Sequence, residues 1–186
     1  LNNILETKII DRKKLGEFLD IDIDSSEYLV VLKHPLSSEI EDSYRQMNIT
    51  MNAISEFAFE NKVKVIGIYP NTDPGSYDIL KVIDDNCSEN IKFYKTLPRE
   101  IFVNIMRNAK VLVGNSSMGI LEAPFYKLPV VNIGNRQKGR LNAGNVEFVE
   151  YDKDQIKKSI EKAFYNKEYR DSVKNLQNPY GDGYAH

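Results

Sequence analysis

The chain has 186 residues and a formal net charge of −2 at pH 7, with 41% hydrophobic and 28% charged residues. These values are typical of a globular domain that can bury an apolar core, so disorder is not expected. The nearly balanced charge, and the lack of any apolar run approaching about 20 residues, argue against nucleic acid and membranes as partners.

Six short apolar runs are spaced along the chain and are separated by longer amphipathic segments. The runs are rich in Val, Ile and Leu, as is typical of strands buried on both faces of a parallel sheet. They cover Tyr28–Leu32, Lys62–Tyr69, Ile91–Tyr94, Lys110–Val113, Val130–Ile133 and Val146–Val149. Their alternation with the amphipathic segments predicts an α/β fold with a doubly wound, Rossmann-like sheet of six parallel strands in the order 3-2-1-4-5-6.

The segments between the runs predict helices. Asp11 is a candidate cap for the first of them, whereas Asn2-Asn3 suits a turn. Further helices are expected over residues 39–61, 77–86 and 98–109, over about ten residues after Ser117, and after Asp152. Helical spacing directs these side chains toward the core: Leu15, Phe18, Leu19, Tyr44, Met47, Met51, Ile54, Ala58, Ile105, Met106, Ile156 and Ile160.

Chemically distinctive residues gather where the predicted strands end. In a parallel sheet these ends share one edge, at which open α/β sheets bind ligands. The strand ending at Val113 leads into Gly114-Asn115-Ser116-Ser117, whose hydroxyls and free N–H groups at a helix start favour an anion such as a phosphate. The strand ending at Ile133 leads into the loop 134–140, in which two glycines bracket cations that include Arg136. A guanidinium can grip phosphate oxygens in a fork.

Glu122 and His34 complete the candidates at this edge. Glu122 lies about one and a half helical turns beyond Ser117, and because a carboxylate repels phosphate we assign it to sugar hydroxyls such as those of a ribose. His34 ends the first strand, where it would offset phosphate charge when protonated or donate one hydrogen bond when neutral. Each candidate has an ordinary alternative, since serines cap helices, basic loops are commonly solvated and strand-end histidines are more often structural.

Cysteine and histidine are too few to suggest a metal. The chain has one cysteine and two histidines, far apart in the sequence. One cysteine excludes a disulfide framework within the chain, which suits the cytoplasm, and so few ligands do not predict a zinc site. The sequence also lacks the Gly-x-x-x-x-Gly-Lys-Ser/Thr loop of ATP-binding proteins. We therefore expect no metal and no cofactor.

Taken together, the motifs carry a specific resemblance. The elements GNSS-x-G-x-x-E-A-P from Gly114, P-V-V-N-I-G from Pro129 and R-Q-x-G-R from Arg136 follow the order and spacing of the hydrolysing UDP-N-acetylglucosamine 2-epimerases. This is the branch of the family that feeds sialic and related nonulosonic acids. The loop Tyr69–Ser76 also resembles that branch's Pro-Asn-x-Asp-x-Gly-Ser, which the non-hydrolysing epimerases match less well. The resemblance covers essentially the whole chain, but only the second domain of the family.

The resemblance implies the C-terminal half of a two-domain architecture of the glycosyltransferase-B type. Residues 1–24 would form an interdomain linker and a short helix, 25–177 the nucleotide-binding domain, and 178–186 the start of a segment returning to the other domain. The implied partners are a UDP-sugar and the missing N-terminal domain of the same enzyme, which would hold most of the acid and base carboxylates. The full-length protein is expected to be a homo-oligomer.

The implied reaction removes the proton at sugar C2 and expels UDP from C1. The resulting glycal adds water and yields free N-acetylmannosamine. The resemblance implies diphosphate or nucleotide contacts for His34, Asn71, Ser116, Ser117 and Arg136, and a ribose contact for Glu122. His34 is the one catalytic candidate of this domain. Ser76, Gly119 and Arg140 would support the site.

Rival functions stay open at this point. A glycosyltransferase donor domain would share the diphosphate loop but transfer the sugar to an acceptor instead of water. A non-hydrolysing epimerase, or a non-catalytic sugar-nucleotide sensor or assembly module, would also bind UDP. Because the catalytic carboxylates belong largely to the other domain, we expect this chain alone to bind UDP weakly and to turn nothing over.

Overall fold

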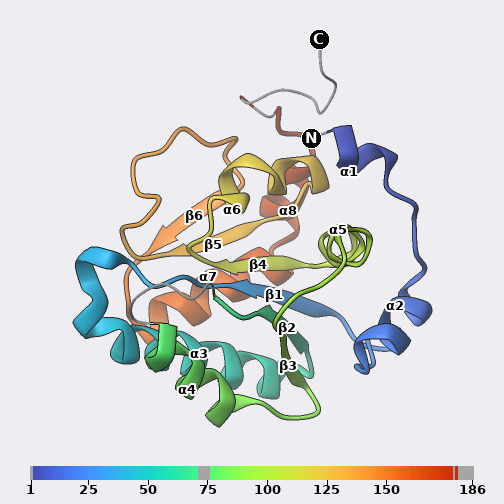
Figure 1. The fold of residues 1–186 in the computed structure, drawn as a ribbon. Coiled ribbons are helices and arrows are strands. Elements are labelled where there is room, and N and C mark those ends of the chain that lie inside the picture. Colours follow the sequence, from blue (N-terminus) through green and yellow to red (C-terminus); the bar gives the residue numbers. More distant parts are fainter. Residues whose placement is uncertain (1, 71–75, 178, 180–186) are drawn as a thin grey trace.

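Six parallel strands form one sheet at the centre of the molecule (Figure 1). The structure is a computed structural model that describes residues 2–70, 76–177 and 179. The strands are β1 (Tyr28–Leu32), β2 (Lys64–Ile68), β3 (Ile91–Tyr94), β4 (Val111–Gly114), β5 (Val130–Ile133) and β6 (Val146–Val149). Their order, β3-β2-β1-β4-β5-β6, and their parallel pairing confirm the predicted doubly wound, Rossmann-like sheet.

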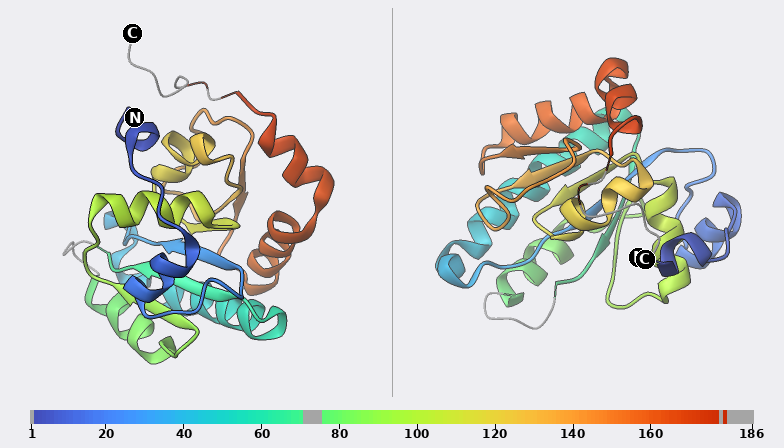
Figure 2. Two further views of the ribbon diagram at one scale, coloured as in Figure 1. Left: turned by 90° about the vertical axis from the view of Figure 1, so that its right-hand side faces the viewer. Right: turned by 90° about the horizontal axis from the view of Figure 1, so that it is seen from above.

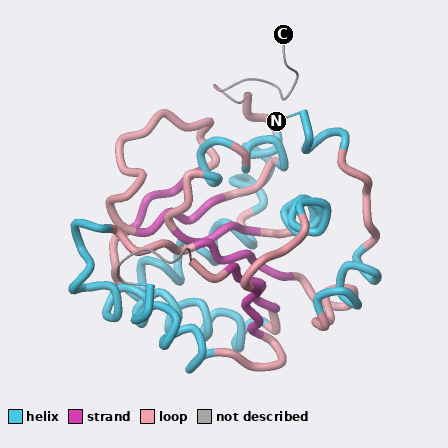
Figure 3. Tube along the Cα trace, in the orientation of Figure 1, coloured by secondary structure: helices cyan, strands magenta, loops and turns pink. Residues whose placement is uncertain are grey.

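Helices cover both faces of this sheet (Figures 2 and 3). The helical elements are α1 (Asn2–Glu6), α2 (Arg12–Leu19), η1 (Ser37–Asp42), α3 (Ser43–Asn61), α4 (Ser76–Asn86), α5 (Arg99–Asn108), α6 (Met118–Leu121), η2 (Ala123–Tyr126), α7 (Lys153–Tyr165) and α8 (Lys167–Lys174). In the part of the chain that the structure describes, no helix is long and apolar enough to cross a membrane.

Each face of the sheet has its own apolar core. One core joins the sheet to α3, α4 and α7, and the other joins it to α2, α5 and the α6–η2 segment. Alternate side chains of β1 enter the two cores: Leu29 and Val31 belong to the first, and Tyr28, Val30 and Leu32 to the second. Because both faces are covered, every residue of β1 is buried, and the strand reads as a continuous apolar run.

Two side chains that were expected in the core are exposed. Phe18 is 56% exposed because α2 turns Leu15 and Leu19 inward, and Phe18 lies about 100° around the helix from Leu19. Tyr44 is 45% exposed because α3 begins at Ser43, after the kinked 3-10 turn η1, and not near Glu39. The Lys81 ammonium lies 5.9 Å from the Tyr44 ring centroid, so this ring packs at the surface.

The helices also differ from the sequence prediction in three places: one expected helix is split, and two helices were not expected. The ten-residue helix expected after Ser117 is split into α6 and η2, since Pro124 has no N–H to donate back to the preceding turn. A short helix, α1, occupies the segment for which a turn was expected. The sequence analysis also missed α8, which Asn166 caps by accepting a hydrogen bond from the Tyr169 N–H.

Gly114 and Gly139 form a matched pair of positions for testing how closely the end of β4 packs against β1. Both have positive φ, but a Cβ on Gly114 would lie 2.0 Å from the Leu32 carbonyl oxygen, whereas a Cβ on Gly139 would meet nothing within 4 Å. Gly139→Ala should therefore cost only the left-handed strain of about 1–2 kcal/mol. Gly114→Ala should cost at least about 3 kcal/mol or prevent folding, as measured by urea denaturation. Equal costs at the two positions would contradict the packing described here.

Candidate functional site

The loops that follow β1, β4 and β5 meet at the carboxyl edge of the sheet. β1 and β4 are neighbours, with Leu32 opposite Gly114, and the Asn115 N–H donates to the Leu32 carbonyl at 3.0 Å. β4 and β5 are neighbours as well, with Gly114 opposite Asn132. The residues that follow these strands, among them His34, Asn115 and Gly134, are therefore brought to one edge although they are far apart in the sequence.

The side chain of Asn115 joins the first two loops. Its Oδ1 accepts from the His34 N–H at 2.7 Å, and its Nδ2 donates to the His34 carbonyl at 2.8 Å. Asn115 is 1% exposed, so both hydrogen bonds are shielded from water. The paired bonds fix the backbone at His34 against the start of the serine loop.

The main chain of Asn115 joins the third loop. Its carbonyl accepts from Arg136 Nη1 at 3.0 Å and from Gln137 Nε2 at 3.3 Å. Gln137 is buried, and its Oε1 accepts from Arg140 Nη1 at 2.7 Å. Arg136 thus contacts the residue that directly precedes Ser116 and Ser117, and the serine loop and the cationic loop share one rim of the sheet.

The serine loop opens a shorter helix than the sequence suggested. The Ser116 hydroxyl accepts from the Met118 N–H at 3.3 Å, while Ser117 makes no side-chain cap of α6. Because α6 spans four residues, its macrodipole is much weaker than that of the ten-residue helix expected here. The positive potential at this rim must therefore come mainly from the cations, with hydroxyl and N–H groups as oriented donors. The alternative in which Ser116 caps a helix also holds in part.

Gly119 allows α6 to lie against the sheet. A Cβ at this position would sit 2.8 Å from Val130 Cγ1. Asn145, 1% exposed, donates from Nδ2 to the Gly119 carbonyl at 3.3 Å and to the Leu128 carbonyl at 3.1 Å. Gly119 therefore positions the helix, and it offers no side chain of its own to a ligand.

The Glu122 carboxylate is paired with Arg99. Oε2 of Glu122 lies 3.6 Å from Arg99 Nη2, which is within the range of an ion pair but too long for a hydrogen bond. This oxygen is buried and has no hydrogen-bond partner among the described residues. The Arg99 guanidinium is 49% exposed, so it is partly solvated as well as paired with this carboxylate. Arg99 belongs to α5, so Glu122 faces the α5 side of the serine loop and retains capacity to accept hydrogen bonds.

The remaining predicted residues are placed less directly. His34 is half-buried, and Ser76 begins α4 with 6% of its surface exposed. Arg140 is exposed and reaches the rim through Gln137. Asn71 lies outside the described residues. In the described part of the chain, no cluster of three or more His, Cys, Asp or Glu could hold a metal ion.

Lys33 is a feature of this edge that the sequence analysis missed. It is only 2% exposed, and its Nζ donates to the His34 carbonyl at 3.2 Å and lies 5.1 Å from the centroid of the Tyr151 ring. Burial lowers the pKa of Lys33 to about 8, with Glu39 opposing and Arg136 reinforcing the shift. The sequence does contain a signal for this residue, because Lys33 directly follows the wholly apolar run Tyr28–Leu32. Asn115 was overlooked as well, although it stands inside the Gly114–Ser117 motif.

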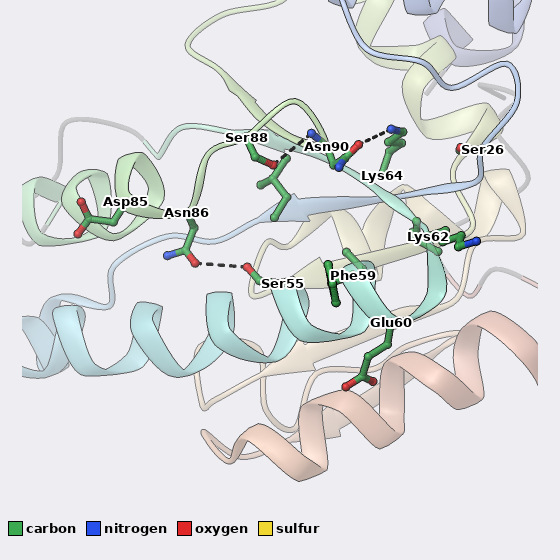
Figure 4. A pocket seen from close by; sticks show the side chains of 13 residues that line it. Ser26, Ser55, Phe59, Glu60, Lys62, Lys64, Asp85, Asn86, Ser88 and Asn90 are labelled. Atoms are coloured by element: carbon green, nitrogen blue, oxygen red, sulfur yellow. Dashed lines mark hydrogen bonds between the residues drawn. The ribbon is translucent and has the colours of Figure 1, made fainter.

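A cavity lies at the opposite edge of the sheet (Figure 4). Its volume is about 870 Å³, and its walls come from the end of α3, the end of α4 and the starts of β2 and β3. Ser55 and Asn86 face one another across part of it, joined by a 3.3 Å hydrogen bond. None of the predicted site residues lines this cavity, and it lies away from the carboxyl edge at which parallel sheets bind ligands. The rim around Asn115 is therefore the better candidate site.

Removing the Asn115 side chain should destabilise the domain. Asn115→Ala removes the acceptor of the His34 N–H and one of two donors to the His34 carbonyl, which keeps its bond from Lys33, so we expect a loss of about 1–3 kcal/mol. Urea denaturation measures this loss. Asn142→Ala is the matched control, because that side chain bonds within its own loop, to Arg140 and Gly144, and should change stability by less than about 1 kcal/mol.

The buried ammonium of Lys33 makes a signed prediction for stability against pH. Its pKa is about 8 in the folded chain and near the ordinary 10.5 when unfolded. Between these values the unfolded chain binds more protons, so the contribution of Lys33 to stability increases with pH, by up to about 1.4 kcal/mol per pH unit. Wild-type stability relative to Lys33→Met should therefore rise between these two pH values. A difference that stays constant with pH would contradict the burial of this charge.

Sequence comparison identifies relatives of the chain. The family model described as UDP-N-acetylglucosamine 2-epimerase matches residues 2–186. A hydrolysing UDP-N,N'-diacetylbacillosamine 2-epimerase from Legionella pneumophila is 29% identical over 184 residues, which are 98% of this chain and 46% of that protein. A hydrolysing GDP/UDP-N,N'-diacetylbacillosamine 2-epimerase from Campylobacter jejuni is 29% identical over 146 residues, or 77% of this chain and 37% of that protein. The chain thus spans less than half the length of these relatives.

Solved structures share the fold. The S. aureus MnaA–UDP co-structure superposes with a TM-score of 0.75 at 15% identity, over 98% of this chain and 48% of that one. The glycosyltransferase WaaG superposes with a TM-score of 0.59 at 14% identity, over 92% of this chain and 46% of that one. These likenesses show the fold, a Rossmann-like domain that covers about half of each of those chains. With the family model matching almost every residue, the chain belongs to the UDP-N-acetylglucosamine 2-epimerase family.

Proposed function

We propose that this chain is the UDP-binding half of a hydrolysing UDP-N-acetylglucosamine 2-epimerase. The whole enzyme would convert UDP-N-acetylglucosamine and water into N-acetylmannosamine and UDP, by elimination to a glycal and addition of water. The observation that carries the proposal is the convergence on Asn115, which holds the backbone of His34 through its side chain and the side chain of Arg136 through its carbonyl. Arg136 and His34 are thereby held against the loop that carries Ser116 and Ser117, and we assign the diphosphate to this rim.

The proposed chemistry needs fixed donors near the leaving group. When UDP departs from C1, negative charge increases on the β-phosphate, so donors already in place stabilise the transition state more than the ground state. Arg136 suits this role because one Nη1 hydrogen bond to Asn115 occupies a single donor of a guanidinium that has five. Its side chain is exposed, so the other donors are open to a ligand. Ser116, Ser117 and His34 would contact the same diphosphate, with His34 as the catalytic candidate.

The nucleotide would extend from the diphosphate toward Glu122. Its carboxylate would exchange the 3.6 Å contact with Arg99 for two ribose hydroxyls. Because the contact with Arg99 is longer than a hydrogen bond, the carboxylate keeps its capacity to accept from these hydroxyls. Asn71 is assigned to the nucleotide and Ser76, Gly119 and Arg140 to support of the site, in keeping with their motif positions.

The other half of the enzyme is part of the proposal. Relatives that are more than twice as long suggest that an N-terminal domain completes the cleft, with residues 1–24 as the linker, 25–177 as this nucleotide-binding domain and 178–186 as the returning segment. Hydrolysis is favoured because both of these relatives are named hydrolysing. A 30% identical relative from Escherichia coli named polysialic acid biosynthesis protein P7 favours a role in sialic acid or surface polysaccharide synthesis. We further propose that the whole protein is a cytoplasmic homo-oligomer.

Nucleotide binding by the isolated chain tests the diphosphate assignment. Calorimetry should give tighter binding of UDP than of UMP, because UMP lacks the β-phosphate that the cations and hydroxyls would hold. Equal affinity for the two nucleotides would refute the assignment. For the two-domain protein, product analysis separates the rivals: hydrolysis releases free N-acetylmannosamine, a non-hydrolysing epimerase keeps the sugar on UDP, and a glycosyltransferase yields a glycoside only when an acceptor is supplied.

Arg136 carries the sharpest single-residue test. Arg136→Ala removes the charge-assisted hydrogen bonds to the diphosphate and should weaken UDP binding by about 1–3 kcal/mol, measured by calorimetry. Lys138→Ala is the control from the same loop, since Lys138 Nζ lies 3.8 Å from Glu150 and is paired away from Asn115. Lys138→Ala should weaken UDP binding much less than Arg136→Ala. Equal losses for the two variants would mean that general loop charge, and not the placement of Arg136, governs binding.

A further inference from the structure

The buried ammonium of Lys33 closes a ring of contacts around the proposed site. Starting from His34, the ring passes through the Asn115 side chain to the Asn115 carbonyl and on to Arg136. The loop of Arg136 begins at Gly134, which has φ of +81° and packs against Tyr151, since a Cβ on Gly134 would lie 2.6 Å from that ring. Lys33 sits over the same ring and donates to the His34 carbonyl, which returns the path to its start.

The groups around Lys33 set the balance of charge at this point. Glu39 of η1 and Arg136 of the cationic loop act on it with opposite sign, Tyr151 presents its ring, and His34 adjoins it in the chain. Glu39 is itself held by Gln46, whose Nε2 donates to Glu39 Oε2 at 2.6 Å. Burial raises the pKa of the Tyr151 hydroxyl far above neutrality, so this ring stays uncharged. Deprotonation of Lys33 would remove the charge from both of its contacts at once.

We propose that Lys33 is a positioning residue for anion binding: its ammonium ties the end of β1 to Tyr151 and thereby holds the loop 134–140, so that Arg136 and His34 keep the spacing that a diphosphate requires. The inference rests on the proposed function, because it concerns the same diphosphate. It also gives a reason for keeping a buried cation, which costs stability, at the end of an otherwise apolar strand.

Substitutions of Lys33 and Tyr151 test the proposal, with UDP binding to the 186-residue chain measured by calorimetry at about pH 7 and about pH 9, on either side of the Lys33 pKa. Lys33→Met should weaken UDP binding at the lower pH by roughly tenfold, because a displaced Arg136 would lose about one charge-assisted hydrogen bond to the diphosphate. The ratio of wild-type to Lys33→Met affinity should shrink at the higher pH, because wild-type Lys33 is then mostly neutral. Titration of UDP itself cancels in this ratio.

Matched variants separate positioning from other effects. Lys158→Met removes the same charge from an exposed position on α7 and should bind UDP like the wild type. Tyr151→Phe keeps the ring under the ammonium and should also bind like the wild type, whereas Tyr151→Leu should weaken binding as Lys33→Met does. At neutral pH, Lys33→Met should be at least as stable to urea as the wild type, so that its weaker binding is not a consequence of unfolding.

The two ideas fail differently. If the wild type binds UDP and Lys33→Met binds it equally well with the same pH dependence, the role of Lys33 is overturned and the proposed function stands. Failure of the folded wild type to bind UDP at either pH would overturn the proposed function, and this inference with it.

Discussion

The arrangement of the rim depends on one buried amide side chain. Asn115 satisfies both backbone hydrogen-bonding groups of His34 and offers its own carbonyl to Arg136 and Gln137. An amide is suited to this place because it has a donor and an acceptor side by side, matching the N–H and the carbonyl of one residue. An aspartate would present only acceptors at neutral pH and would repel the His34 carbonyl. Asn115 therefore has a structural role at the start of the short polar loop after β4, directly before Ser116 and Ser117.

Much of the fold follows from the sequence, while the details of the site depend on contacts between distant residues. The six apolar runs gave the strands and their order, because strands covered on both faces leave an unambiguous pattern. Helix boundaries were less predictable where local chemistry intervened, as at Pro124, which divides the helix after Ser117. The placement of Arg136 beside the serine loop agrees with its expected position at the sheet edge. The pairing of Glu122 with Arg99, however, has no local sequence signal, since it joins α5 to the segment after β4.

Cationic groups at this edge are held close together at a cost in stability. Arg136 contributes to lowering the pKa of Lys33, which means that the two positive charges repel one another through the protein. Glu39 offsets part of this repulsion from the η1 side. A bound anion would relieve the rest, and residues arranged for ligand affinity often reduce the stability of the empty fold in this way. The chain as a whole has a net charge of −2, so the closeness of Lys33 and Arg136 is a local feature of this rim.

The bond between His34 and Asn115 spans 81 residues of sequence, and the one between Asn115 and Arg136 spans a further 21. During synthesis on the ribosome, the chain cannot complete this rim until the segment beyond Gln137 has left the exit tunnel. β1, β2 and β3 have by then emerged and are free to pair, with two apolar faces still to be covered by later helices. The order of the strands along the chain thus means that the rim around Asn115 forms late in translation, after most of the domain has been synthesised.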